Sequence, residues 1–290
     1  MPTVPELYQT EYSSNLLTRY QQSQSRLQPF VNLEDFSGER KDYPRLSAAS
    51  APTDISGVAR GSATPYNDAD FDKRWVYPVP FEKVTHFAQW DEKFLGKISL
   101  PNSEVQGEHV KAFMRLTDDV IIAAALGNAK SGKAGTTDVA LPAGQKIAHG
   151  STGMTLAKLM NTLDILDDAD NLDDPDLQRI FIWTVKQRSQ LLNTTEVKSS
   201  DYNTVKALAE GKIDSFMGFT FKIVKRLPLV STTRTCVAFQ VGAIRGTRFM
   251  KPSSLTVRDD IRNALQVYDT GLVGAVRVMD EGVVSIECTE

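Results

Sequence analysis

The stretch "KAFMRLTDDVIIAAALGNAKSGKAG", residues 111–135, joins a long amphipathic segment to a loop of small residues. Side chains that share one helical face recur before and within it at steps of three or four: Val105, His109, Phe113, Leu116, Val120 and Ala124. This period predicts an α-helix. Ser103 and Gln106 stand at capping-box spacing at its start, and Gly127 stands where helices favour glycine at the end. About 24 residues at 1.5 Å each give roughly 36 Å, which is longer than an ordinary domain needs.

The loop after this helix also matches a phosphate-binding pattern. G-x-x-x-x-G-K is complete at Gly127, Gly132 and Lys133, but Ala134 stands where a Ser or Thr hydroxyl would hold magnesium. A phosphate loop follows a strand and opens a helix, whereas this one follows the negative end of a helix dipole. A P-loop nucleotide-binding enzyme is therefore the least favoured hypothesis, and we expect a flexible crossing between two domains here.

Composition is that of a globular protein. The 290 residues are 41% hydrophobic and 24% charged, which suits one large domain or two ordinary ones. The net charge of −3 indicates no basic surface for tight nucleic-acid binding. Cys236 and Cys288 are expected to stay reduced. Neither a signal peptide nor a membrane span is predicted, so we expect a soluble protein made in a cytoplasm.

The sequence contains no complete catalytic or metal-binding motif. His86, His109 and His149 stand singly and form no metal-ligand pair, and G-x-S-x-G does not occur. The acidic run of residues 164–176 fails as a calcium loop, because Leu172 and Asp173 occupy positions that need an oxygen ligand and a glycine. We therefore predict no catalytic residue, no cofactor and no metal, and a protein that is not an enzyme.

The N-terminal third is extended rather than compact. Residues 1–30 carry a thin apolar stripe that cannot form a core of its own, so we expect it to lie on a neighbour. Two strand-like stretches follow, "FVNLEDFSGERKDYPRL" (30–46) and "DFDKRWVYPVPFEKVTHFAQW" (70–90), joined by an Ala/Ser/Gly/Pro-rich connection. They predict two long strands of a projecting hairpin, and the prolines at 44, 78 and 80 argue against central strands.

The remainder alternates between helix and strand patterns. Helices are predicted at 155–169, 186–192 and 201–211, and strands at 179–185, 218–227 and 235–241. The tail from residue 254 predicts strands with a turn at Asp280–Gly282. The chain as a whole is thus predicted to be α+β.

This order of parts resembles the major capsid proteins of tailed double-stranded DNA bacteriophages. The helix with Arg115, Asp118 and Asp119 is similar to the family's spine helix. "STGMTLAKLMNTLDIL" (151–166) resembles the helix that enters the axial domain, and "GAVRVMDEGVVSIECTE" (274–290) resembles the terminal strand pair. The segment 191–228 resembles the family's segment in which a short helix, "DYN", a glycine and a Gly-Phe strand follow one another. The resemblance implies a capsid fold with a spine helix, a projecting β-hairpin (the extended loop) and a mixed α/β axial domain.

The resemblance also implies a division of the chain. Residues 1–35 would be the N-terminal arm and 36–92 the extended loop. Residues 93–135 and 250–290 would form the peripheral domain, and 136–249 the axial domain. The chain lacks the long N-terminal scaffolding segment of some members, so scaffolding would be a separate protein or absent. No Lys and Asn align with the crosslinking pair of other members.

The implied function is that of a structural protein. It would self-assemble into hexamers and pentamers of an icosahedral head, with scaffolding, portal and decoration proteins as partners and no membrane. Packaged double-stranded DNA would be met by weak, non-specific contacts. The protein would be made in the host cytoplasm and reside in the virion capsid. An encapsulin-like compartment shell is the alternative with the same architecture.

Subunit contacts are expected on the projecting hairpin, because exposed edges and aromatic side chains there require a cover. Six residues are the candidates: Arg60, Lys73, Arg74, Trp75, Tyr77 and Phe81. The alternative for the aromatic residues is packing of the hairpin base onto the spine helix. Phe87 and Trp90 fit either role equally well.

Overall fold

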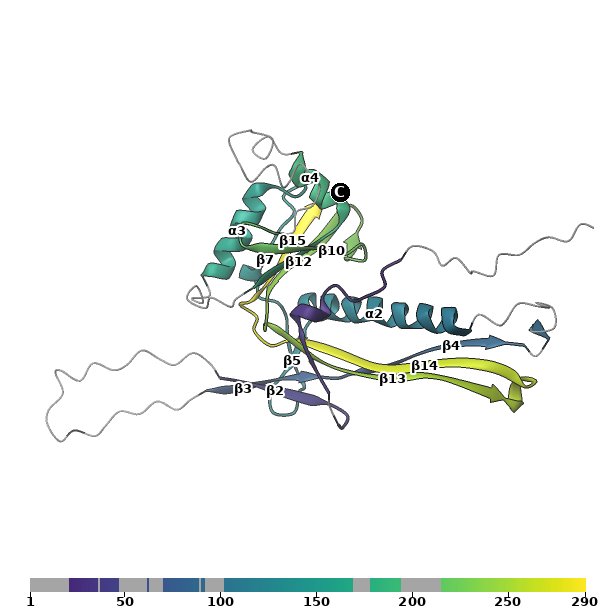
Figure 1. The fold of residues 1–290 in the computed structure, drawn as a ribbon. Coiled ribbons are helices and arrows are strands. Elements are labelled where there is room, and N and C mark those ends of the chain that lie inside the picture. The colour runs from purple at the N-terminus through teal and green to yellow at the C-terminus, as the bar shows by residue number, and fades with distance from the viewer. Residues whose placement is uncertain are drawn as a thin grey trace, which may run out of the picture. The chain divides into compact units, whose positions relative to one another are not determined.

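The computed structural model describes residues 21–35, 37–46, 62, 70–88, 90–91, 102–168, 178–193 and 215–290. Figure 1 shows a mixed fold of helices and sheets, which confirms the α+β class. Within the described residues there are three α-helices: α2 (Asn102–Leu126), α3 (Leu156–Asp167) and α4 (Val185–Leu192). The N-terminal arm up to residue 20, Arg60 and the helix predicted at 201–211 lie outside the described residues.

Helix α2 is the long helix that the sequence predicts, and it has 25 residues. Of the predicted apolar face, His109 and Phe113 are buried, but Leu116, Val120 and Ala124 are only partly buried. In the second half of the helix the buried face lies one position later, at Ile121 and Ala125. The helix ends at Gly127, whose N–H donates to the Ala123 carbonyl at 2.8 Å. A Cβ at Gly127 would lie 2.7 Å from that same oxygen, so only glycine fits the end of the helix.

The first of three sheets has the strand order β1-β13-β14-β4. Its strands are β1 (Asn32–Glu34), β13 (Ile244–Arg258), β14 (Ala264–Arg277) and β4 (Val79–Phe87). A short 3-10 turn, η4 (Asp259–Ile261), connects the two long strands. After it, Arg262 and Asn263 adopt left-handed conformations, with φ of 50° and 54°, which let the chain reverse direction.

The second sheet carries the main core. Its order is β7-β15-β12-β8-β10-β9, with β11 on β12. The strands are β7 (Lys146–Ile147), β15 (Val283–Thr289), β12 (Thr233–Gln240), β8 (Arg179–Trp183), β10 (Phe219–Ile223), β9 (Ser215–Phe216) and β11 (Leu229–Val230). The 3-10 turn η3 (Ala143–Gln145) precedes β7. The predicted strands at 179–185, 218–227 and 235–241 are confirmed.

An aromatic cluster fills this core where β8 and β10 run parallel. The rings of Trp183 and Phe221 stack with centroids 4.2 Å apart, and Phe181 meets Phe219 edge to face at 5.6 Å. Helix α3 adds its buried Leu159 and Leu166 to the same core. Such pairs contribute about 0.5–1.5 kcal/mol each beyond the area that they bury.

The third sheet, β2-β3-β5-β6, corrects the prediction for residues 70–90. These residues form two strands instead of one, because the chain breaks at Tyr77 and Pro78. β3 (Phe71–Val76) pairs with β2 (Lys41–Leu46), while β4 belongs to the first sheet. Pro44 lies on the edge strand β2, and Pro80 on the edge strand β4, as expected for residues that cannot donate to a ladder.

The predicted flexible crossing after α2 is also wrong. The described chain there forms β5 (Ala129–Ser131) and β6 (Thr137–Val139), and β5 extends the sheet through its pairing with β3. Lys130 forms an ion pair with Asp138 at 2.8 Å. Gly132 and Gly135 have φ of +86° and +72°, so they shape a tight hairpin turn.

The chain divides into two compact units. Unit 1 takes its described residues from the ranges 21–24, 80–116 and 250–271. Unit 2 takes its own from 25–79, 117–249 and 272–290 and holds the main core. In unit 1, the N-terminal part of α2 contacts β4 and β14. His109 bonds to Thr85 at 2.8 Å and to Asp269 at 2.6 Å.

Candidate functional site: the stem of β2 and β3

The stem is the antiparallel pair of β2 and β3, which holds six residue pairs from Lys41↔Val76 to Leu46↔Phe71. At the far end of the pair Leu46 and Phe71 lie opposite each other, and their exposed fractions are 60% and 71%. An apolar cross-strand pair with this exposure gains little within its own chain. It is therefore a candidate contact surface for a partner.

Three of the predicted contact residues lie on or beside the stem. Lys73 is exposed and forms an ion pair with Asp42 at 2.7 Å; this hydrogen bond lowers the pKa of the Asp42 carboxyl. Trp75 is half-buried and donates its Nε1–H to the Gly132 carbonyl at 2.6 Å. Tyr77 remains 42% exposed and donates its hydroxyl to the Gly135 carbonyl at 3.3 Å. The half-buried Phe81 belongs to β4, outside the stem.

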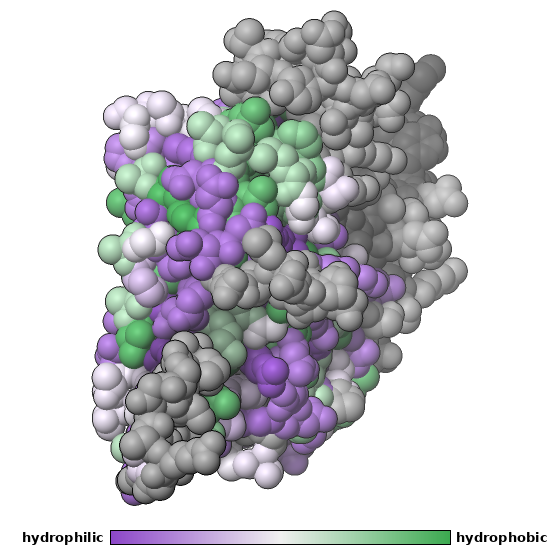
Figure 2. All heavy atoms as spheres, turned by 90° about the vertical axis from the view of Figure 1, so that its left-hand side faces the viewer, coloured by the Kyte–Doolittle hydropathy of each residue, from purple (hydrophilic) through white to green (hydrophobic). Residues whose placement is uncertain are grey.

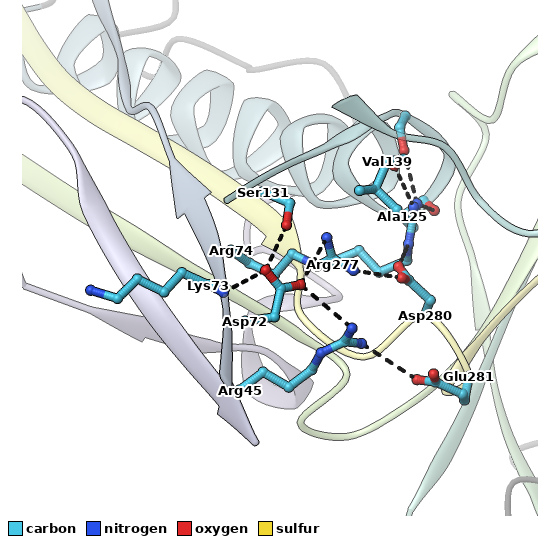
Figure 3. A network of polar contacts seen from close by, with 11 residues as sticks. Arg45, Asp72, Lys73, Arg74, Ala125, Ser131, Val139, Arg277, Asp280 and Glu281 are labelled. Atoms are coloured by element: carbon cyan, nitrogen blue, oxygen red, sulfur yellow. Dashed lines mark hydrogen bonds and ion pairs between the residues drawn. The ribbon is translucent and has the colours of Figure 1, made fainter. Parts of the chain in front are cut away.

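Arg74 requires a correction. Its exposed fraction is 2%, so it offers no charge to a neighbour. Figure 3 shows its guanidinium inside a network of polar contacts. Its Nη2 donates to Asp280 Oδ2 at 2.8 Å, while Arg277 Nε donates to Asp280 Oδ1 at 2.6 Å. Two guanidinium groups thus share one buried carboxylate.

Arg277 links this network to the end of the long helix. Its Nη1 donates to the carbonyl oxygens of Ala125 at 3.1 Å and Gly127 at 2.8 Å, and its Nη2 donates to Val139 at 3.1 Å. The last carbonyls of a helix lack partners within the helix and carry the negative end of its dipole. The buried Arg277 guanidinium donates hydrogen bonds to these carbonyls and places a positive charge at the negative end of the helix dipole.

A second carboxylate, Asp72, lies beside the first cluster (Figure 3). It accepts hydrogen bonds from the Ser131 hydroxyl and the Lys73 N–H, both at 2.7 Å. Arg74 and Arg45 approach it at 3.5 and 3.6 Å. Burial raises the pKa of Asp72, but these hydrogen bonds and charges outweigh it, so the pKa of the carboxyl lies below its ordinary value. Arg45 also reaches Glu281 at 3.9 Å.

The network ties four parts of unit 2 together: the stem, the hairpin of β5 and β6, the end of α2 and the turn between β14 and β15. Sequence reasoning identified the turn at Asp280–Gly282 but missed the roles of Asp280 and Arg277. No local signal marks them, because Arg74 and Asp280 are 206 positions apart. Their contacts fix the base of the β2–β3 stem within unit 2.

The loop of Gly127, Gly132 and Lys133 does not support nucleotide binding. A strand rather than a helix follows the glycine, and Lys133 lies in the turn between β5 and β6. No helix N-terminus is therefore aimed at a phosphate there. Across the described ranges, no group of three or more acidic, His or Cys residues could hold a metal ion. Of the helices in those ranges, none is long and apolar enough to cross a membrane.

The face drawn in Figure 2 mixes hydrophobic and hydrophilic side chains in small groups. Exposed large apolar residues are likewise dispersed over unit 2, for example Met160, Val185 and Val230.

The arrangement of the elements matches solved phage capsids. The capsid of cyanophage P-SCSP1u is similar over 99% of this chain and 94% of that one, with 14% identity and a TM-score of 0.72. Mycobacterium phage Che8 matches over 96% of both chains, with 14% identity and a TM-score of 0.72. The head of Helicobacter pylori bacteriophage KHP40 matches over 97% and 96%, with 12% identity and a TM-score of 0.68. No curated protein matches the chain in sequence.

These likenesses show that the chain has the fold of solved phage capsids. The sequence then gives the family, because the family model described as phage capsid protein matches residues 4–290. The chain belongs to the phage capsid protein family. Its role is that of a structural protein of the virion capsid, and it associates with further copies of itself in the capsid lattice.

Proposed function

We propose that the chain is the major capsid protein of a tailed phage, and that hexamers and pentamers of it form an icosahedral head around double-stranded DNA. The observation that carries this proposal is the family match over residues 4–290. The proposal is also supported by solved phage capsid structures that are similar to this chain over more than nine-tenths of both chains. The protein acts without catalysis, through contacts of moderate strength that let misplaced subunits leave again.

The extended loop supplies one of these contacts in our proposal. Its stem presents Leu46, Phe71 and Tyr77 to the outside, and the buried network of Asp280 supports its base. Lys73, Trp75 and Phe81 remain candidates for the same contact, and so does Arg60, which lies outside the described residues. An aromatic or aliphatic anchor on a rigid support loses little conformational freedom on binding.

We further propose that assembly takes place in the host cytoplasm with scaffolding and portal proteins, and that decoration proteins add to the shell. The net charge of −3 favours weak contact with packaged DNA, which confinement would hold in place. The domain division proposed from the sequence (1–35, 36–92, 93–135 with 250–290, and 136–249) applies to this assembly.

Sedimentation velocity of the purified chain tests the proposal. We expect a fast, uniform boundary from large closed assemblies, and we expect Phe71→Ser to shift the material towards free subunits or capsomers. Nucleic acid within the particles would support a phage head, whereas a protein cargo would support an encapsulin-like compartment. A chain that stays monomeric or dimeric across salt and concentration would contradict both.

A further inference from the structure

A row of hydrogen-bonded side chains lies within unit 1, on β4, α2, β13 and β14. Thr85 Oγ1 is 2.8 Å from His109 Nε2, and His109 Nδ1 is 2.6 Å from Asp269 Oδ2. The Ser253 hydroxyl donates to the other oxygen of Asp269. Since 24 positions separate Thr85 from His109 and 160 separate His109 from Asp269, no local motif in the sequence displays this row.

Asp269 determines which nitrogen of the imidazole carries the proton. A carboxylate only accepts hydrogen bonds, so the proton of the His109 ring lies on Nδ1. Nε2 then has a free lone pair and accepts the hydrogen bond from the Thr85 hydroxyl. A hydroxyl, a base within hydrogen-bond reach and an acid that orients the base are the three parts of an activated oxygen nucleophile.

Burial differs along the row in a way that suits this chemistry. His109 and Asp269 each have an exposed fraction of 1%, so water does not compete for their hydrogen bond. Thr85 is only half-buried and lies on the edge strand β4, and its neighbours Val84 and His86 are exposed. The base is therefore held in place while the hydroxyl remains within reach of a small electrophile.

We propose that Thr85 is an acyl-acceptor site for carboxylic esters with a good leaving group, with His109 as its base and Asp269 as a positioning residue. Thr85 Oγ1 bonds to the acyl carbon, and the bond from that carbon to the leaving oxygen breaks. The hydroxyl proton passes to His109 Nε2 and then to the leaving group. One acyl group is added to each chain without turnover. This inference concerns unit 1 alone and does not depend on the formation of a shell.

Acetylation of the unassembled full-length chain by p-nitrophenyl acetate tests the proposal, with mass spectrometry of peptides to locate the product. Thr270 is the internal control, because it is also half-buried in unit 1 but donates to the Phe81 carbonyl at 3.3 Å instead of to an imidazole. A general base contributes roughly 10²–10⁴-fold to such a step, so Thr85 should react at least about 100-fold faster than Thr270. Equal rates at the two threonines would overturn the proposal, and this comparison requires no variant.

Substitution of the base separates activation from accessibility. His109→Gln keeps the Thr85 hydroxyl in place but removes the base, so acetylation at position 85 should fall to the rate of Thr270. Thr85→Ser should remain reactive, whereas Thr85→Val, which has a similar shape, should gain no acetyl group there. Undiminished acetylation of Thr85 in a folded His109→Gln variant would contradict the role of the imidazole.

The positioning role of Asp269 has a readout of its own. In Asp269→Asn the amide can donate to Nδ1, which moves the ring proton to Nε2 and removes the acceptor for the Thr85 hydroxyl. Nitrogen NMR of the His109 ring should show this change of tautomer together with slower acetylation of Thr85. A changed tautomer with undiminished acetylation would overturn the proposal.

Discussion

Replacing Asp280 by alanine tests whether the buried network holds the stem formed by β2 and β3. The substitution removes the carboxylate that accepts from Arg74 at 2.8 Å and from Arg277 at 2.6 Å. The exposed fractions of these two arginine side chains are 2% and 0%, so water cannot replace the lost partner. Two charge-assisted hydrogen bonds and an unpaired buried charge give an expected loss of about 3–5 kcal/mol.

Urea and thermal denaturation of the unassembled chain measure this loss. For a unit of this size, the expected change lowers Tm by roughly 10 °C. Asp138→Ala is the matched control, because its ion pair with Lys130 at 2.8 Å has side chains that are 48% and 43% exposed. An exposed pair contributes about 0–1 kcal/mol, so this variant should unfold almost like the parent.

Asp280→Asn separates charge from shape. It keeps one acceptor oxygen but leaves Arg277 without a counter-charge and Arg74 with Asp72 alone, at 3.5 Å, so its stability should lie between those of the parent and the alanine variant. If Asp280→Ala and Asp138→Ala cost the same small free energy, the network does not support the stem. If Asp280→Asn equals the parent, hydrogen bonding rather than charge is what matters there.

Three further perturbations address other parts of the chain. A Cβ at Gly274 would lie 2.8 Å from Pro78 Cα. Gly274→Ala should therefore lower the free energy of unfolding by about 1–3 kcal/mol, measured by thermal denaturation. Gly107→Ala is the control, because a Cβ there would meet nothing within 4 Å, and it should be neutral or stabilising by up to about 1 kcal/mol. Asp269→Ala leaves the buried His109 without its partner at 2.6 Å, so it should cost about 1–3 kcal/mol and speed hydrogen exchange in α2 and β14. Equal exchange in parent and variant would refute that role. Hydrogen bonds from Arg234, and then from Lys186 and Gln187, lower the pKa of Glu290 to about 2 from 4.5. Their stabilisation is therefore complete above pH 4.5 and is lost as the pH falls towards 2. In urea titrations at each pH, Glu290→Gln should flatten this dependence, and an unchanged slope would argue against it.

Local signals account for most of the elements that were predicted correctly. The apolar period and Gly127 define α2, and the side chains of Thr155 and Thr184 accept hydrogen bonds at the starts of α3 and α4. Those signals depend on residues within one or two turns. The strands of the main core are short runs of aromatic and β-branched residues, which the sequence also displays directly.

Long-range pairing accounts for what the sequence did not reveal. Residues 70–90 alternate like one strand, and only the partners of β3 and β4 show that they join different sheets. Arg74 looked like an exposed charge in a projecting hairpin, because its neutralising carboxylate lies 206 positions away. Leu46 and Phe71 form a candidate subunit contact because the register of β2 and β3 places them opposite each other, and the sequence does not show that register.

Electron microscopy of the purified protein with symmetric reconstruction tests the central claim most directly. We predict closed icosahedral particles built from hexamers and pentamers, with the stem that carries Leu46 and Phe71 against a neighbouring subunit. Particles without these capsomers, or a chain that forms no closed particles under any assembly condition, would contradict the proposed function.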